Sequence, residues 1–139
     1  MKVLALDYGS ARTGVAVSDP TGTVARPLEV VENASSPAGL RHLAELLERE
    51  EAERIVVGLP VTLRGERGAQ AEETEAFVLA LRAVTDIPIE SFDERFTTKL
   101  ALQTGRERAK RPSGDAPPDA VAAAHLLSTY LEWQSALRR

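Results

Sequence analysis

The stretch LALDYGSARTGVAVSD, residues 4–19, contains two short apolar runs, each of which ends next to an aspartate. The first run, Lys2–Leu6, has the continuous apolar character of a strand buried on both faces. The second, Gly14–Ser18, follows a loop of Gly, Ser, Arg and Thr, so the pair predicts a β-hairpin. This arrangement puts the charge of Asp7 at the tip of the strand that we expect to be most buried. A carboxylate in such a place needs compensation, because burying an uncompensated charge is costly.

Outward from this hairpin, the chain alternates between strand and helix patterns. The further predicted elements are a strand at Thr23–Pro27, a helix at about 37–52 capped by Ser36, a strand at Arg54–Leu59, a helix at about 69–84, a strand at Ile87–Phe92, a short helix from Thr97 to about Arg108 and a last helix at about 118–137. A three-strand meander followed by α-β-α-β-α predicts an α/β fold with a mixed five-stranded sheet and helices on both faces. With no repeat or linker, residues 1–139 are expected to form one domain.

Composition narrows the classes of chemistry. There is no cysteine, which excludes thiolate sites. There are only two histidines, His42 and His125, which are too few for a histidine-rich metal site. A metal would be held by oxygen ligands, which favours Mg²⁺ or Mn²⁺. No apolar run approaches the ~20 residues of a membrane span, and the N-terminus lacks the pattern of a signal peptide. We therefore expect a cytoplasmic protein with no membrane partner.

Charge is unevenly distributed along the chain. The net charge is −4, yet residues 95–111 carry six basic side chains and one acid. Segment 104–118, TGRERAKRPSGDAPP, is rich in Gly, Pro, Ser and charge, which predicts a mobile basic loop. Such a flank is compatible with binding nucleic acid, and an ordinary solvated surface is the alternative.

Acidic residues mark the ends of three predicted elements. Asp7 closes the first strand, Asp93 and Glu94 follow the fifth, and Asp119 opens the last helix. Asp119 has Ala122, Ala123 and Leu126 at helical spacing, so we expect it to face the sheet. Taken singly, each acid has a structural alternative: a turn bond for Asp7, an ion pair with Arg95 for Asp93 or Glu94, and the helix dipole for Asp119.

Taken together, these acids predict a metal site. The carboxyl ends of parallel strands share one edge of a sheet, where sites of α/β proteins gather. Converging carboxylates repel one another unless a cation neutralises them. Two divalent ions ~3.5–4 Å apart, held by such carboxylates, form the usual arrangement for hydrolysis at phosphorus. The charge of Asp7 would then be tolerated because a metal binds it.

Four motifs in order resemble those of the YqgF (RuvX) family, Holliday-junction-resolvase-like proteins of the ribonuclease H-like superfamily. They are DYGSARTGVAVSD, VVGLP with the following LRGERG, FDERFTT and PPDAVAAAHLLSTYL. The resemblance spans nearly the whole chain and implies a ribonuclease H-like fold. It also implies nuclease action on the precursor of small-subunit ribosomal RNA, in ribosome biogenesis, or on DNA junctions.

The resemblance also implies roles for particular residues. Asp7 and Asp119 would be catalytic metal ligands, and the acid of FDER would be the third. We favour Glu94 over Asp93, because its longer side chain reaches further from the strand end. The phosphate-contacting candidates are Arg12, Arg64, Arg67, Arg95, Lys110 and Arg111. Such contacts position a nucleic acid backbone without reading its sequence.

The chain departs from related patterns at two places. Resolvases of the RuvC type carry an acid at the end of the strand next to the first, whereas here that strand ends in Gly58-Leu59-Pro60. Leu63-Arg64 also stands where Met-Asp is common in the family. The expected site is therefore shifted relative to that of the RuvC type.

The sequence favours a metal-dependent endonuclease that acts, as monomer or homodimer, on structured RNA or branched DNA. The resemblance to the ribonuclease H-like superfamily implies that its product carries a 5′-phosphate. Two other readings compete with it. A non-catalytic nucleic-acid-binding protein of the same fold would bind without cutting. An ATP-binding domain is suggested by DYGS…TG, which resembles the phosphate loop of actin-like ATPases and sugar kinases; those proteins need a second lobe that 139 residues cannot supply.

Overall fold

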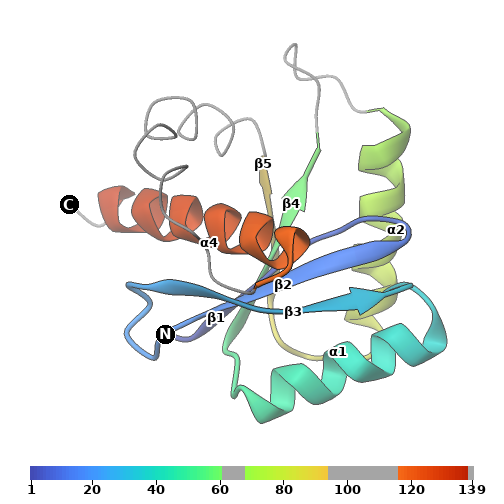
Figure 1. Cartoon of the computed structure of the whole chain (residues 1–139), viewed down its shortest axis with the longest axis horizontal. Coiled ribbons are helices and arrows are strands. Elements are labelled where there is room, and N and C mark those ends of the chain that lie inside the picture. The colour runs from blue at the N-terminus through green and yellow to red at the C-terminus, as the bar shows by residue number, and fades with distance from the viewer. Residues whose placement is uncertain (61–67, 94–115, 138–139) are drawn as a thin grey trace.

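The computed structural model describes residues 1–60, 68–93 and 116–137 (Figure 1). Its strands and helices are β1 (Val3–Asp7), β2 (Arg12–Ser18), β3 (Ala25–Glu32), α1 (Pro37–Arg49), β4 (Arg54–Leu59), α2 (Ala69–Arg82), β5 (Ile89–Asp93) and α4 (Pro118–Leu137). The strands form one five-stranded sheet in the order β3-β2-β1-β4-β5. The predicted mixed sheet and α/β class are thus confirmed.

Strand β1 lies at the centre of the sheet and is apolar over its first four residues, all of them buried. It pairs antiparallel with β2, and Asp7 lies opposite Gly14. On its other side it runs parallel to β4, with Leu6 level with Val57, and β4 runs parallel to β5. The carboxyl ends of β1, β4 and β5 therefore lie at one edge of the sheet, as the alternation of strands and helices predicted.

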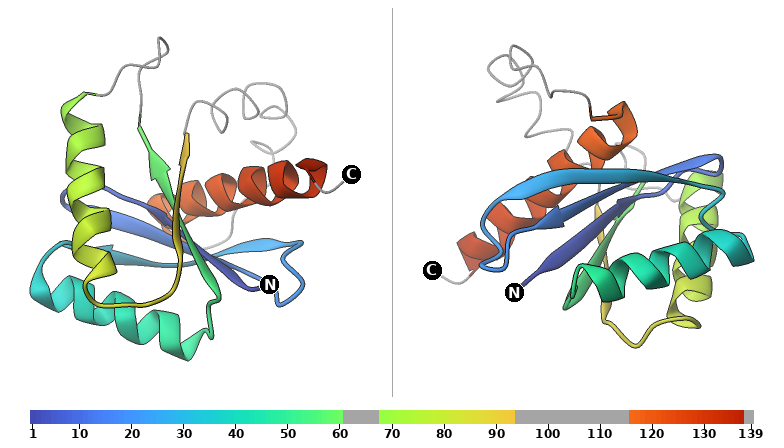
Figure 2. Two further views of the ribbon diagram at one scale, coloured as in Figure 1. Left: turned by 180° about the vertical axis from the view of Figure 1, so that it is seen from behind. Right: turned by 60° about the horizontal axis from the view of Figure 1, so that its bottom comes forward.

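Each face of the sheet has its own hydrophobic core, as expected for strands that are apolar on both sides. Helices α1 and α2 cover one face, where Leu4 and Leu6 pack in the core. Helix α4 crosses the other face, where Val3 and Ala5 pack with Leu127 (Figure 2). The period-two alternation of β1 thus assigns even residues to α1 and α2 and odd residues to α4.

Helix α1 begins as the sequence predicts. Ser36 is its N-cap, its hydroxyl accepts a hydrogen bond of 3.0 Å from the amide of Gly39, and Pro37 follows at the first helical position. Within residues 1–60, 68–93 and 116–137, no helix has the length and apolarity needed to cross a membrane.

The third strand is longer than predicted. Pro27 was expected to end it, but β3 continues to Glu32. Proline is tolerated because β3 is an edge strand, and the register shifts between Val15 and Ala16 where Pro27 is paired. The predicted helix from Thr97 to about Arg108 and most of the predicted loop 104–118 lie outside the described residues.

Candidate active site

Asp7 occupies the position that the sequence predicts for it. It is the last residue of β1 and is half-buried. Its odd number places it on the same face as Val3 and Ala5, under α4. The carboxylate therefore lies at the boundary between the buried sheet and solvent, at the edge where β4 and β5 also end.

Gly14 brings the start of α4 against this edge. A Cβ built on Gly14 would lie 1.8 Å from the carbonyl oxygen of Asp119. No side chain can occupy that space, so the contact between helix and strand depends on glycine. Because Gly14 pairs with Asp7, the same contact brings Asp119 beside the end of β1.

The orientation of Asp119 differs in part from the prediction. Ala123 and Leu126 are buried, but Ala122 is exposed. The buried stripe begins instead at Ala120. The side chain of Asp119 is 38% exposed, and its Oδ2 lies 3.3 Å from Nε of Arg12. It thus stands at the rim of the packed surface, where a carboxylate stays accessible to a cation.

The loop between β1 and β2 holds Arg12 close to these acids. Gly9 allows the loop to close tightly, because a Cβ there would lie 2.4 Å from the carbonyl oxygen of Arg12. Thr13 is fully buried and its hydroxyl donates to the carbonyl of Gly9 over 3.4 Å. The guanidinium of Arg12 is mostly exposed, so it can contact a ligand at the site.

Asp93 lies at the same edge but on a different face. It is level with Leu59 at the end of β4. Its strand neighbour Phe92 packs in the core under α4, whereas Ile89 packs against the core under α1 and α2. By alternation, Asp93 shares the face of Ile89 and points away from the face of Asp7.

Within the described residues, no group of three His, Cys, Asp or Glu side chains could hold a metal ion. Asp7, Asp93 and Asp119 thus do not form such a group together. Glu94 and five of the six phosphate-contacting candidates, Arg64, Arg67, Arg95, Lys110 and Arg111, lie outside the described residues. Arg12 is the sixth candidate, and it lies beside Asp119.

A pocket of about 150 Å³ opens beside Asp7. Its walls are Asp7, the loop at residues 8–10, Pro60 and one side of the start of α2, formed by Gln70, Glu73 and Thr74. These residues of α2 were not predicted from the sequence to lie beside Asp7. The signal that could have identified them is their i, i+3, i+4 spacing at the start of a helix that follows a strand ending at the same edge.

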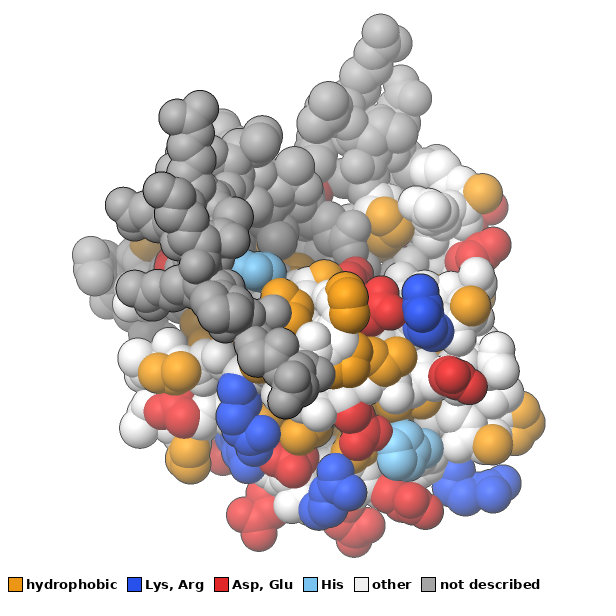
Figure 3. Space-filling view, in the orientation of Figure 1, with side chains coloured by type: hydrophobic (Ala, Val, Ile, Leu, Met, Phe, Trp, Pro, Cys, Tyr) orange, Lys and Arg blue, Asp and Glu red, His pale blue; other side chains and the backbone are white. Residues whose placement is uncertain are grey.

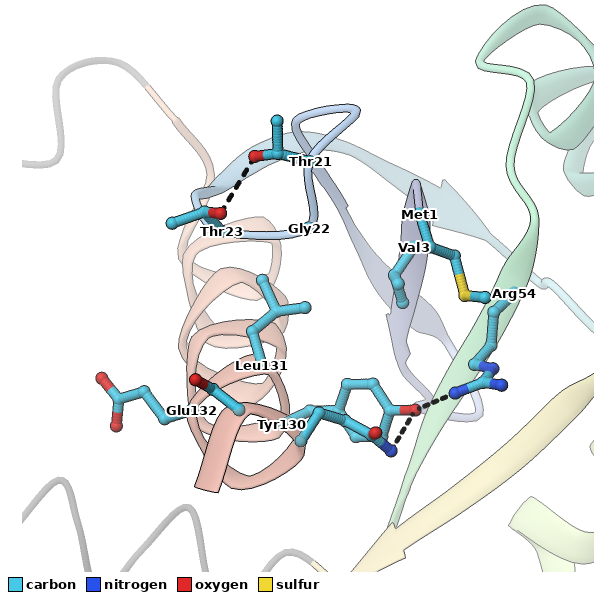
Figure 4. A pocket seen from close by; sticks show the side chains of 11 residues that line it. Met1, Val3, Thr21, Gly22, Thr23, Arg54, Tyr130, Leu131 and Glu132 are labelled. Atoms are coloured by element: carbon cyan, nitrogen blue, oxygen red, sulfur yellow. Dashed lines mark hydrogen bonds between the residues drawn. The ribbon is translucent and has the colours of Figure 1, made fainter. Parts of the chain in front are cut away.

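The opposite end of the sheet has a larger pocket, of about 300 Å³ (Figure 4). Three of the polar side chains that line it meet at the hydroxyl of Tyr130. The hydroxyl of Tyr130 accepts from Arg54 over 2.9 Å and from Gln134 over 2.9 Å, and donates to Glu90 over 2.6 Å. Burial and then the bond to Glu90 raise the pKa of Tyr130, and the bond with Tyr130 raises the pKa of Arg54.

Asp19, the second aspartate of the opening stretch, is a turn residue at this same end. Its carboxylate accepts from the hydroxyl of Thr21 and from the amides of Thr23 and Val24, over 2.7 and 2.8 Å for the amides. These hydrogen bonds, that of Thr21 first, hold the pKa of Asp19 well below its usual range.

The surface over α1 carries both signs of charge. Glu29 contacts His42 and Arg49, and Glu50 contacts Lys2 and Arg26. In Figure 3, acidic and basic side chains are interspersed on the lower part of the visible face. This part of the described surface is therefore not a continuous basic face for a polyanion.

Comparison with known proteins by sequence identifies one family. The model of the RuvX family, described as Holliday junction resolvase, matches residues 1–133. A protein of Rubrobacter xylanophilus named "Putative pre-16S rRNA nuclease" is 45% identical over 135 residues, covering 94% of this chain and 92% of its own. A protein of Desulforudis audaxviator with the same name is 36% identical, covering 94% of each chain.

Solved structures share the fold at low identity. The structure described as Thermus thermophilus RuvC in complex with a Holliday junction substrate has a TM-score of 0.68 and 18% identity, covering 98% of this chain and 96% of that one. A fowlpox virus resolvase solved with Holliday junction DNA has a TM-score of 0.54 and 11% identity, with full coverage of both chains. These likenesses support the ribonuclease H-like fold predicted from the motifs.

Proposed function

The chain belongs to the RuvX family, and from that premise we propose that it is a divalent-metal-dependent endonuclease that hydrolyses phosphodiester bonds in structured nucleic acid. The observation that supports the proposal is the contact of Gly14 with the backbone of Asp119, because Gly14 pairs with Asp7 and the start of α4 therefore lies near the end of β1. Two half-exposed carboxylates at the edge of a sheet fit Mg²⁺ or Mn²⁺, which prefer oxygen ligands. A divalent ion, when bound, supplies activation of water and neutralisation of charge at the phosphate.

The side chains of this protein would hold the metal ion and position the substrate. Asp7 and Asp119 would hold the metal from β1 and α4, which are fixed to each other through Gly14. Arg12, exposed beside Asp119, would contact a phosphate and so position the backbone of the substrate. Arg64, Arg67, Arg95, Lys110 and Arg111 are proposed as further backbone contacts.

Glu94 is our proposed third ligand. Asp93 lies on the same face of the sheet as Ile89, which packs on the face opposite to Asp7. This position favours the next acid in the sequence, Glu94, as the metal ligand. We expect Glu94→Gln to abolish metal-dependent cleavage and Asp93→Asn to retain most of it, measured as single-turnover rates at saturating Mn²⁺. The reverse result would assign the third ligand to Asp93, and retention of cleavage in both variants would remove the FDER motif from the metal site.

Two substrate classes follow from the comparisons. The relatives are named for the precursor of 16S ribosomal RNA, and the family description is for Holliday junctions. A ribosomal RNA precursor can be cut by one protomer, whereas symmetric cutting of a four-way junction requires a dimer.

The test uses two labelled substrates, a four-way DNA junction and a structured fragment of ribosomal RNA precursor. Each is incubated with Mg²⁺, Mn²⁺ or a chelator, with wild type and Asp7→Asn in parallel. We expect metal-dependent cleavage by wild type that Asp7→Asn lacks, and the faster substrate identifies the class. Cleavage that is absent, or equal in both proteins, would leave a nucleic-acid-binding protein without catalysis.

A further inference from the structure

The pocket next to Asp7 differs in chemistry from a phosphate site. Glu73 and Gln70 of α2 line it with a carboxylate and an amide, and Asp7 borders it at the end of β1. Carboxylates repel phosphate groups and accept hydrogen bonds from N–H donors, whereas an amide offers both a donor and an acceptor. The pocket is therefore suited to a neutral group with N–H donors at its edge.

Two ring side chains also line the pocket. Tyr8 and Pro60 provide them, and Tyr8 is itself fixed by stacking on Phe77 with ring centroids 4.4 Å apart. Thr74 is buried and its hydroxyl donates to the carbonyl of Gln70 over 2.8 Å, which fixes the first turns of α2. Ring side chains together with hydrogen-bonding groups are the kind of surroundings that bind an unstacked nucleobase.

We propose that this pocket binds a nucleobase next to the cleaved phosphate, and that Glu73 selects a base with an amino group: guanine, adenine or cytosine. The inference rests on the proposed nuclease function, since the pocket borders the end of β1, where Asp7 lies. Uracil and thymine have a single imide N–H and two carbonyl oxygens, so they present the Glu73 carboxylate with fewer donors. A ribose is disfavoured, because it has no flat apolar face to match Tyr8 and Pro60.

The first test is cleavage of a substrate library in which the positions flanking the cut are randomised. Wild type is expected to favour an amino-bearing base over uracil or thymine at one position by about tenfold. Glu73→Gln should reduce this preference to about twofold, because the Gln side chain can also donate to carbonyl oxygens. The matched control is Glu72→Gln, which removes the same charge from the same helix at an exposed residue outside the pocket. An unchanged preference in Glu73→Gln would overturn the proposal.

The second test separates failure of the pocket from failure of the nuclease. Guanosine, adenosine, cytidine and uridine are titrated into ¹⁵N-labelled protein in the presence of chelator, and the amide resonances of Gly9, Ser10 and Gln70 are followed. The first three nucleosides should shift these resonances more than uridine does in wild type and in Glu72→Gln, but not in Glu73→Gln. Shifts without any cleavage would retain the base site and overturn the nuclease. Cleavage without shifts would retain the nuclease and overturn the base site.

Discussion

The two ends of the sheet use carboxylates in opposite ways. At the end where β2 turns into β3, Asp19 is saturated by one hydroxyl and two amides, and Glu90 is bound into the network of Tyr130 and Arg54. At the other end, Asp7 and Asp119 stand at the rim of the core, and Asp119 contacts the exposed guanidinium of Arg12. A carboxylate that accepts several hydrogen bonds from the protein stabilises the fold, whereas a carboxylate at the rim can be reached by a metal ion. We therefore propose different roles for the two aspartates of LALDYGSARTGVAVSD, Asp19 in a turn and Asp7 in the metal site.

The difference between the two ends is tested most directly by neutralising one aspartate at each end. We expect Asp119→Asn to slow metal-dependent cleavage about a thousandfold, because a metal contributes several kcal/mol of transition-state stabilisation and each 1.36 kcal/mol is tenfold. Its thermal unfolding midpoint should change little, since exposed ion pairs contribute little to stability. Asp19→Asn should lower the unfolding midpoint and leave the cleavage rate intact. Loss of cleavage in both variants would show that the two ends are not functionally distinct.

A second comparison tests the contact that assembles the site. Gly14→Ala places a methyl group where the backbone of α4 lies, so it should destabilise the protein by about 1–3 kcal/mol and lower cleavage with it. Gly68→Ala is the matched control, because no atom of the described residues lies within 4 Å of a Cβ built there. Denaturant unfolding and single-turnover cleavage are measured for both. Equal stability of the two variants would contradict the close packing of α4 on β2.

Arg12 and Arg26 allow the two ends of the sheet to be compared by their contributions to nucleic acid binding. Their side chains are 66% and 58% exposed, and each contacts an acid, but at opposite ends of the sheet. Arg12→Ala should weaken nucleic acid binding and lower the slope of log affinity against log salt by about 1, as expected when one phosphate contact is lost. Arg26→Ala should leave that slope unchanged. Fluorescence anisotropy over a range of salt concentrations measures both slopes.

The smallest expected effect is a pH dependence at Asp19. Because its pKa is lower in the folded than in the unfolded state, it stabilises the fold above the unfolded pKa, near 3.8. This stabilisation is lost as the pH falls below that value towards the folded pKa. The difference in unfolding midpoint between wild type and Asp19→Asn should therefore be full at pH 7 and smaller at pH 3. A constant difference would contradict the role of the charged carboxylate in the turn.

The features that could be predicted from the sequence depend on residues only a few positions apart in the chain. Period-two alternation and apolar runs located β1 and β4, the Ser36-Pro37 pair located the start of α1, and the end of β1 located Asp7. These features follow from backbone dihedrals and hydrogen bonds among residues a few positions apart. The order of the elements was then enough to predict the sheet, because crossover rules allow few topologies.

The tertiary structure decided what depends on pairs that are distant in the chain. The continuation of β3 past Pro27 followed from its place at the sheet edge, and the approach of Asp119 to Asp7 followed from Gly14, over a hundred residues before it. The face of Asp93 and the pocket lined by Gln70 and Glu73 likewise depend on register and helix packing. Composition and periodicity depend on residues that are close together in the sequence. Close packing depends instead on the shapes of side chains that belong to different helices and strands.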